Sequence, residues 1–190
     1  MRTNFEVENM KYLIASDIHG SAYYCEQLLQ AYEREKADRL LLLGDILYHG
    51  PRNDLPKDYN PKDVIAMLNA KKEDILCVRG NCDTEVDQMV LEFPIMAEYA
   101  LISLGKRMLF VTHGHKMNKD NPPMLKEGDI LLNGHFHVPA CEEMSSFIYM
   151  NPGSVSIPKE NSAHGYMVLE DNLFSWKDLE GNEYKRVELS

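Results

Sequence analysis

Three short apolar runs in the first half of the chain constrain the fold more than any other feature of the sequence. They occupy residues 12–16, 40–43 and 75–78, a length typical of buried strands. Between them, helical spacing of apolar residues extends from Ser21 to about Lys36, and an Asn-Pro pair opens a second helix at Pro61. This alternation predicts parallel strands that are joined by crossover helices.

The second half of the chain predicts short strands joined by tight turns. We expect strands at residues 98–104, 107–112, 129–133, 147–150, 165–170, 173–178 and 184–189, with hairpin-like breaks at 105–106, 171–172 and 181–182. The fold class predicted is α/β: two packed mixed β-sheets flanked by helices, a four-layer α/β/β/α sandwich. No repeat or linker divides the chain. Residues 10–190 are therefore predicted to form a single domain, and residues 1–9 a short N-terminal extension.

The balance of charge narrows the class of partner. Thirty acidic residues against 20 basic ones give a net charge of −10. This disfavours long nucleic acids and anionic membranes, because both bind basic surfaces. No apolar run approaches the ~18 residues that a membrane span requires. The four cysteines form no C-x-x-C pair and residues 1–10 lack the apolar core of a secretory signal, so we expect a cytoplasmic protein.

Potential metal ligands directly follow the predicted strands. Four of them come after the three apolar runs of the first half: Asp17, His19, Asp45 and Asn81. Because the carboxyl ends of parallel strands lie along one edge of a sheet, we expect these side chains to meet there. Two H-x-H pairs, at 113–115 and 135–137, also follow apolar runs. Within each pair, and within Asp17-Ile18-His19, extended backbone would project both side chains to the same side.

The mixture of ligand types limits the metal. Carboxylates, one amide oxygen and several imidazoles are too rich in nitrogen for calcium or magnesium, and they suit Mn, Fe, Zn or Co. The candidate ligands exceed the needs of one ion: Asp17, His19, Asp45, Asn81, His113, His135 and His137. Two ions ~3.5–4 Å apart can clamp both oxygens of a phosphate ester during hydrolysis. We therefore predict two divalent ions, with Mn²⁺ preferred over Fe, Zn, Co or Ni.

The motifs together resemble a known family. D-x-H at 17–19, G-D at 44–45, G-N-x-D at 80–83, H-G-H at 113–115 and G-H-x-H at 134–137 match, in order, the calcineurin-like metallophosphoesterases. Segments 49–53 (H-G-P-R-N), 79–83 (R-G-N-C-D) and 151–155 (N-P-G-S-V) are similar to its small bacterial branch, the YfcE-like phosphodiesterases. The resemblance covers about residues 10–189. It implies a metallophosphoesterase sandwich that hydrolyses small phosphodiesters, as a homodimer or homotetramer.

The resemblance also implies a role for each ligand. One metal would be held by Asp17, His19 and His137, and the other by Asn81, His113 and His135, with Asp45 bridging the two. A hydroxide activated by the two metals would attack phosphorus in line. The resemblance further implies that five residues take part in catalysis: Asp45, Asn81, Cys82, Asp83 and His115.

One position departs from the broad family. Most members have His after the G-N of the third motif, where it protonates the leaving group or stabilises the transition state, whereas this chain has Cys82. A thiol with an ordinary pKa near 8.5 is a weaker general acid at neutral pH, although a metal could deprotonate it. An inert buried thiol is the alternative. The departure favours diesters with good leaving groups, and the YfcE-like branch resembles this chain in carrying Cys there.

Other candidates have alternatives of comparable weight. His115 could orient a metal ligand, touch substrate, or simply lie behind the site. Asp83 could support Asn81 or a ligating histidine, or cap a helix over residues 84–89. Arg52 is the natural phosphate ligand of its loop, unless it is only a solvated surface residue. His49 could line the same rim, while His164 has no partner motif and is interpreted as a surface residue.

Three functions compete on these residues. The first is a phosphodiesterase with a binuclear metal centre, and the second is a phosphomonoesterase or nucleotide pyrophosphatase at the same site. The third is a protein-binding scaffold, similar to the retromer subunit that shares this fold and has a degraded metal site. Because all seven ligand positions here keep residues able to coordinate, the sequence favours an enzyme.

Overall fold

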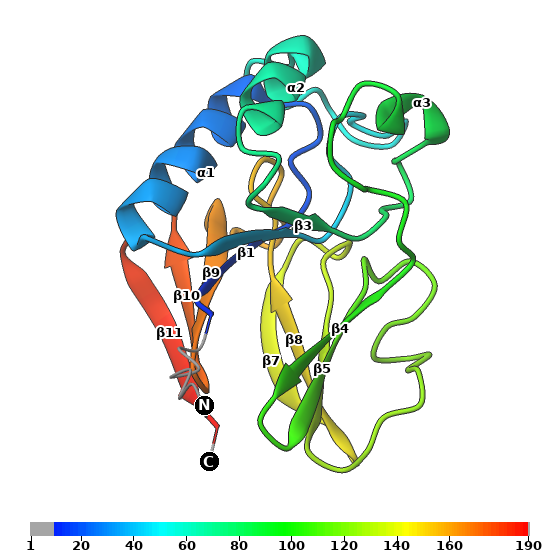
Figure 1. Ribbon diagram of the computed structural model, residues 1–190, viewed down its shortest axis with the longest axis vertical. Coiled ribbons are helices and arrows are strands. Elements are labelled where there is room, and N and C mark those ends of the chain that lie inside the picture. The colour runs from blue at the N-terminus through cyan, green and yellow to red at the C-terminus, as the bar shows by residue number, and fades with distance from the viewer. Residues whose placement is uncertain (1–9, 190) are drawn as a thin grey trace, which may run out of the picture.

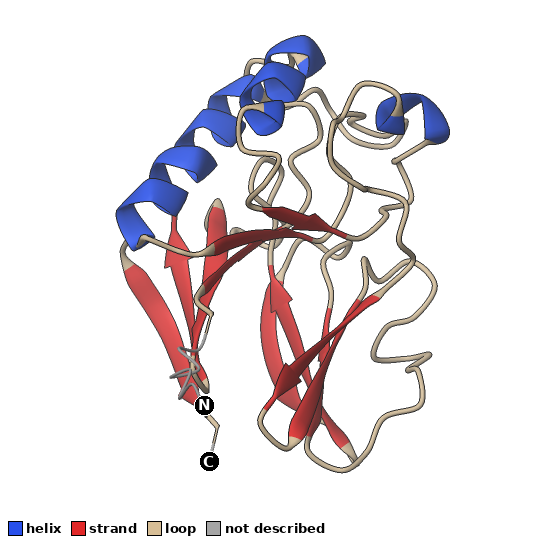
Figure 2. Ribbon diagram, viewed as in Figure 1, coloured by secondary structure: helices blue, strands red, loops and turns tan. Residues whose placement is uncertain are grey.

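Two β-sheets packed face to face form the body of the molecule (Figures 1 and 2). The computed structural model describes residues 10–189, so the predicted extension at 1–9 lies outside the described residues. The first sheet has the strand order β11 (Glu183–Glu188), β10 (Leu173–Asp178), β9 (Gly165–Glu170), β1 (Tyr12–Ala15), β2 (Arg39–Leu42) and β3 (Ile75–Cys77). The second has the order β4 (Ala100–Leu104), β5 (Arg107–Val111), β6 (Asp129–Leu132), β8 (Phe147–Pro152) and β7 (Pro139–Glu143).

Both sheets are mixed, as predicted. β1, β2 and β3 pair in parallel, and β9 joins β1 in the antiparallel sense. In the second sheet, β5, β6 and β8 are parallel and the outer strands are antiparallel. Candidate metal ligands follow, within a few residues, the carboxyl ends of five strands: β1, β2, β3, β5 and β6.

Three helices accompany the sheets within residues 10–189. α1 (Ala22–Glu35) begins at the Ser21 cap, and α2 (Pro61–Asn69) begins at Asn60 with proline in the first position. α3 (Glu85–Gln88) is a single turn closed by a capping box at Thr84. Apolar residues of α1 and α2 pack against the outer face of the first sheet. The outer face of the second sheet carries its own apolar cluster, against which Leu125 of the loop between β5 and β6 packs in place of a helix.

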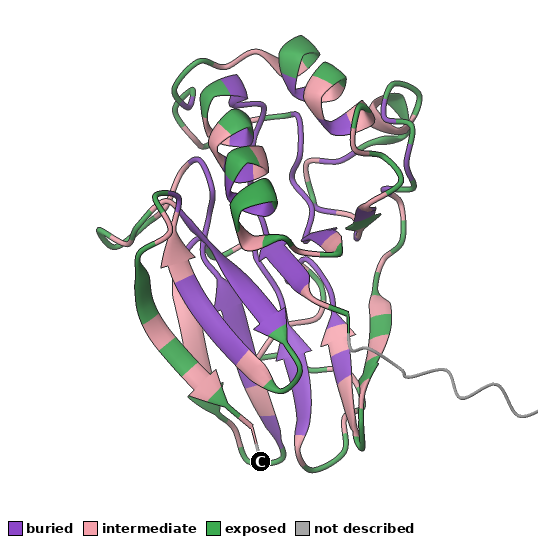
Figure 3. Cartoon of the chain, turned by 60° about the vertical axis from the view of Figure 1, so that its left-hand side comes forward, coloured by how far each residue is buried: buried purple, intermediate pink, exposed green. Residues whose placement is uncertain are grey.

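The core between the two sheets holds them in a fixed relation. Trp176 and Phe174 of β10 are fully buried and pack with Ile14 of β1 and with Val111 and Leu132 of the second sheet. Figure 3 shows the central strands as almost continuously buried. Burying each large apolar side chain contributes about 1.5–3 kcal/mol. The sheets are therefore a rigid base for the loops that follow their strands.

One strand has no signal in the sequence. β7 (Pro139–Glu143) reads Pro-Ala-Cys-Glu-Glu, without apolar alternation, and its residues are half-buried or exposed. It pairs with β8 alone, at the edge of the sheet. An edge strand needs only one bonded neighbour and can begin with proline, so its composition resembles that of a loop.

Candidate metal centre

The loops after β1, β2 and β6 turn sharply through left-handed backbone. The φ angles of Asp17, His19, Asp45, His135 and His137 lie between 50° and 65°, a region that residues other than glycine rarely adopt. The extended backbone expected within the 17–19 and 135–137 pairs is therefore wrong. Asp17 and His19 still meet, with 3.5 Å between Oδ1 and Nε2, and His135 and His137 both line one cavity. Backbone held in this unfavourable region is common at functional sites.

Glycines allow the loops that carry the candidate ligands to approach one another closely. A Cβ at Gly80 would lie 2.1 Å from Asp45 Oδ1, and one at Gly134 would lie 2.9 Å from Asp17 Oδ2 and 1.9 Å from Ser16 Oγ. No side chain fits at either position. The ligand-bearing loops of the two sheets can thus converge only because these residues are glycines.

Asp17, His19 and His137 form one cluster. Asp17 Oδ1 lies 3.2 Å from His137 Nε2 and 3.5 Å from His19 Nε2. Both Asp17 Oδ1 and His19 Nε2 are buried and have no hydrogen-bond partner. Leaving such atoms unpaired is costly unless a ligand takes them up. The donor set and the unpaired atoms fit a divalent cation.

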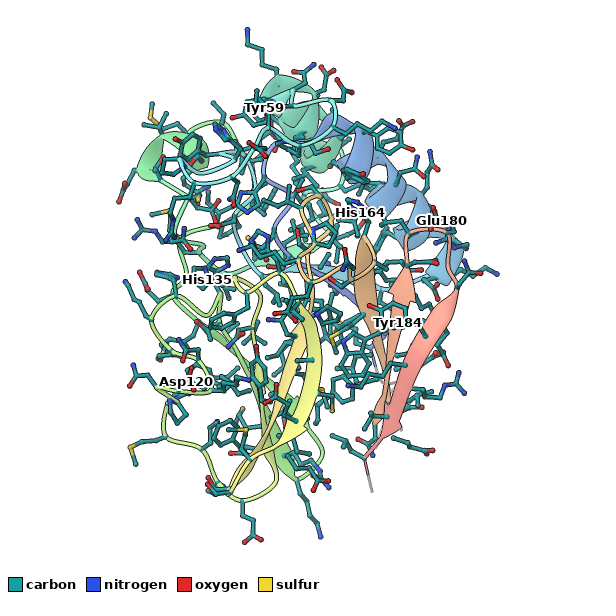
Figure 4. All side chains as sticks on the ribbon, turned by 180° about the vertical axis from the view of Figure 1, so that it is seen from behind. Tyr59, Asp120, His135, His164, Glu180 and Tyr184 are labelled. Atoms are coloured by element: carbon teal, nitrogen blue, oxygen red, sulfur yellow. The ribbon has the colours of Figure 1, made fainter. Side chains whose placement is uncertain are left out.

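Asp45, Asn81, His113 and His135 form a second cluster beside the first. His113 Nε2 lies 3.4 Å from Asp45 Oδ2 and 3.1 Å from Asn81 Oδ1. The ring of His135 is 5.0 Å from that of His113, and Figure 4 places His135 at the end of the second sheet nearer the helices. Asp45 Oδ2 is also 3.7 Å from His19 Nε2. One carboxylate thus reaches both clusters, as a bridging ligand must.

Backbone carbonyls orient three of the histidines. Nδ1 of His19 donates to Tyr48 O at 2.7 Å, that of His113 to Leu43 O at 2.7 Å, and that of His137 to Ile157 O at 2.8 Å. Because a carbonyl can only accept, these bonds hold a proton on Nδ1, so that Nε2 carries the lone pair in the neutral form of each ring. Each Nε2 faces the carboxylates. This is the usual outer bond of a metal-binding histidine.

The electrostatics of the cluster favour a cation. Burial would raise the pKa of Asp17, but contacts with His137 and His19 hold it well below its usual range. Burial likewise lowers the pKa of His113, yet the contact with Asp45 and the charges of both carboxylates raise it to about 9. Burial and the neighbouring His113 lower the pKa of His135 to about 4. Burial would also raise the pKa of Asp45, but its contact with His113 lowers it, so both carboxylates are ionised at neutral pH.

Cys82 lies at the edge of the second cluster. Its backbone N–H donates to Asp45 Oδ1 at 2.8 Å, and Asn81 Nδ2 lies 3.2 Å from its sulfur. The side chain is half-buried and lines the same cavity as the ligands. Burial, followed by the charge of Asp45, raises the pKa of the thiol. Without a metal, Cys82 is therefore a protonated thiol at neutral pH.

Asp83 supports the site through the backbone. Its buried carboxylate accepts N–H bonds from Asp45 at 2.9 Å, Ile46 at 2.9 Å and Gly80 at 2.7 Å. The cap of α3 is Thr84 rather than Asp83. Asp83 is also predicted from the sequence to support the side chain of Asn81 or a ligating histidine, but the hydrogen bonds of its carboxylate are with backbone N–H groups. Asp83 instead fastens the loop after β2 to the loop after β3.

The N-P-G-S-V segment, which had no role in the sequence beyond a tight turn, fastens the two sheets together at the site. The hydroxyls of Ser154 and Ser156 donate to Asp17 O at 3.0 and 2.9 Å. Asn151 Nδ2 donates to Gly134 O at 2.8 Å. These bonds fix the loop that carries Asp17 and the loop that carries His135. No local pattern reveals them, because their partners lie far away in the chain.

A cavity of about 420 Å³ opens over the two clusters. Of the other candidates, Arg52 lines it, whereas His115 lies behind the ligands with its ring 5.5 Å from that of His113. His49 turns away, and its ring packs against Tyr48 and Tyr59. His164 is half-buried rather than a free surface residue, since it stacks on Tyr24. The cavity also exposes two residues absent from the prediction, Phe136 and Lys159.

The chain belongs to the calcineurin-like phosphoesterase superfamily, whose domain model matches residues 10–172. Among curated proteins, it is 45% identical over 166 residues to phosphodiesterase YfcE of Escherichia coli K12, covering 87% of this chain and 90% of that protein. It is 25% identical to the probable metallophosphoesterase YsnB of Bacillus subtilis, covering 94% of this chain and 97% of that one.

Solved structures agree with this assignment. The E. coli YfcE phosphoesterase superposes with a TM-score of 0.91 at 42% identity, over 95% of this chain and 100% of that one. Vps29 of Cryptosporidium parvum superposes with a TM-score of 0.62 at 15% identity, over 96% and 100%, and shares the fold alone. Within residues 10–189, no helix has both the length and the apolar character that crossing a membrane requires.

Replacing Asp83 by Asn should loosen the metal site without removing a ligand. The amide presents an N–H₂ group where three backbone N–H groups need acceptors, so we expect a loss of about 1–3 kcal/mol in the free energy of unfolding. We also expect Mn²⁺ to bind about 10- to 100-fold more weakly. Urea denaturation and metal titration measure the two effects. Glu85→Gln, two residues away and exposed, is the control; equal Mn²⁺ affinity in both variants would contradict the role of Asp83.

Proposed function

We propose that this chain is a binuclear-metal phosphodiesterase that hydrolyses small phosphate diesters. The observation that carries the proposal is the position of Asp45, whose Oδ2 is 3.4 Å from His113 Nε2 and 3.7 Å from His19 Nε2. A single carboxylate is thus available to two metals. The similarity to a protein named as a phosphodiesterase, at 45% identity, supports the reaction class.

The proposed ligand assignment follows the two clusters. Asp17, His19 and His137 would hold one ion, and Asn81, His113 and His135 the other, with Asp45 between them. Ions bound there supply Lewis acidity and lower the pKa of water, which is the chemistry that ester hydrolysis needs. We propose Mn²⁺, because the mixed oxygen and nitrogen ligands suit it, as they do Fe, Zn, Co and Ni.

The remaining residues of the site bind and orient the substrate. Arg52 lines the cavity and can bind phosphate oxygens with its planar guanidinium group. His115 stands against His113 and His135 and would restrict how their rings turn. Cys82, held beside Asp45 as a protonated thiol, can donate a hydrogen bond but is a poor acid. This set favours substrates whose leaving group needs little protonation.

A scaffold function has less support. The Vps29 structures share only the fold with this chain, at 15–19% identity. All seven candidate ligands keep coordinating groups, and Asp17 Oδ1 is buried without a hydrogen-bond partner. A protein that never binds a cation gains nothing from burying an unpaired carboxylate oxygen. The enzyme is therefore the better account of these residues.

Removal of metal should abolish turnover of bis(p-nitrophenyl) phosphate, and Mn²⁺ should restore it. Asp45→Asn should lower the restored kcat by more than about 100-fold, beyond the usual effect of residues that only support a ligand. His135→Ala should act in the same direction. Release of p-nitrophenolate measures each rate, with Glu85→Gln as the control. Unchanged turnover in Asp45→Asn would exclude the bridged site.

Replacement of Cys82 by His should shift preference from diesters towards monoesters. An imidazole is a better general acid than a thiol at neutral pH, so it should help poorer leaving groups most. We expect the ratio of monoester to diester kcat/KM to rise roughly tenfold, within the usual contribution of general acid catalysis. Cys82→Ser, which keeps a small side chain, is the matched control. If the unaltered enzyme, Cys82→His and Cys82→Ser all gave the same ratio, residue 82 would not determine which leaving groups the enzyme accepts.

We also propose that the chain associates with copies of itself in the cytoplasm. Four free cysteines are consistent with a reducing compartment. Leu101 of edge strand β4 and Met124 of the loop between β5 and β6 are exposed and line a cavity of about 550 Å³. Light scattering should give the mass of a dimer or tetramer, and Leu101→Glu should reduce it. The mass of a single chain for the unaltered protein would refute the association.

A further inference from the structure

Beyond the candidate metal ligands, two residues to which the motifs give no role line the cavity. Phe136 and Lys159 line the same 420 Å³ cavity as Asp45, Asn81 and Cys82. They come from neighbouring loops, because the backbone N–H of Lys159 donates to His137 O at 3.0 Å. Both are exposed to solvent. They are therefore positioned by a metal-binding loop while remaining available to a substrate.

The geometry of the H-F-H turn explains why Phe136 faces the cavity. His135 and His137, with φ angles of 65° and 61°, turn their rings towards the clusters and leave the phenyl ring between them at the rim. The ring of Phe136 lies 5.3 Å from that of His135, edge to face, and is 37% exposed. A large aromatic ring left exposed in this way offers a surface on which a planar group can stack.

Lys159 places a positive charge at the same rim. Its loop is fixed by Ser162, whose backbone N–H and hydroxyl both donate to Lys159 O. Some lysines, such as Lys71 and Lys116, pair with glutamates, whereas Lys159, like several other lysines, forms no ion pair with another described residue. In a chain of net charge −10, an unpaired cation that borders an anion-binding cavity is well placed to bind a second negative group.

We propose that Phe136 and Lys159 form the subsite for the ester arm that stays on phosphorus, and that this arm is aromatic and carries a negative group of its own. This rests on the proposed phosphodiesterase function. Cys82, at the position that resemblance links to the leaving group, belongs to the Asn81 loop, whereas Lys159 is bonded to the His137 loop. The two arms of the diester would therefore contact different loops of the cavity.

The aromatic part is tested with two substrates that release the same p-nitrophenolate. Bis(p-nitrophenyl) phosphate retains an aromatic arm, and methyl p-nitrophenyl phosphate retains a methyl group. Phe136→Ala should lower the ratio of their kcat/KM values by about 3- to 10-fold relative to the unaltered enzyme, the range of an aromatic stacking contact. Phe136→Tyr, which keeps the ring, should preserve the ratio. Comparing variants cancels the intrinsic difference in reactivity between the substrates.

The charged part is tested with the p-nitrophenyl ester of thymidine 5′-phosphate, with and without a 3′-phosphate. The unaltered enzyme should prefer the 3′-phosphorylated form, and Lys159→Gln should reduce that preference about 10-fold, as expected for a hydrogen bond to a charged group. Lys159→Arg should restore most of it. Lys106→Gln, an exposed lysine outside the cavity, is the control. Added salt should weaken the preference of the unaltered enzyme.

The two proposals fail in different ways. If the Mn²⁺-loaded enzyme does not hydrolyse bis(p-nitrophenyl) phosphate at all, the phosphodiesterase function is wrong, and the subsite falls with it. If it does, and both ratios are the same in Phe136→Ala and Lys159→Gln as in the unaltered enzyme, the subsite alone is wrong. An unaltered enzyme without preference for the 3′-phosphate would also overturn the role of Lys159.

Discussion

The close approach of the loops after β2 and β3 is the constraint on which the site depends. A Cβ at Gly44 would lie 2.3 Å from the backbone nitrogen of Gly80, so the two loops touch through backbone alone. The carboxylate of Asp83 holds them together by accepting three N–H bonds. Asp45, whose Oδ2 lies near a histidine of each cluster, is within this junction. Its position therefore follows from contacts that are not themselves part of the chemistry.

A second set of contacts joins this junction to the other sheet. Asp17 O receives the hydroxyls of Ser154 and Ser156, and Gly134 packs against Ser16 with no room for a side chain. The strands of the two sheets share an apolar core but no backbone pairing. Without these bonds, sliding of one sheet over the other would separate Asp17 from His137. The packing of the two sheets makes the body of the protein rigid. The bonds from Ser154 and Ser156 and the close contact at Gly134 align the loops that carry the candidate ligands.

Sequence reasoning succeeded where one local pattern determines the outcome. Apolar runs predicted the central strands, and ordered polar residues after them predicted a set of candidate ligands that the structure brings together. It failed where the cause is distant or ambiguous in the sequence. The left-handed backbone of Asp17 and His135 depends on the surrounding loops, β7 has the composition of a loop, and the partners of Asp83 lie 37 and 38 residues away. Lys159 reaches the cavity only through its bond to His137 O, 22 positions earlier, and therefore belongs to no motif.

The protein and its proposed substrate are both negatively charged, so the site must attract an anion despite the net charge of −10. Asp17 and Asp45 are buried, ionised and close together, an arrangement that repels an anion until cations are bound between them. Two divalent ions would reverse the sign of the potential locally, and Arg52 and Lys159 would extend the positive region to the rim. The acidic surface beyond remains negative, and it repels long polyanions more strongly than small diesters because they carry more charge past it. Selectivity for small substrates thus follows from confining the positive potential to one cavity of an acidic protein.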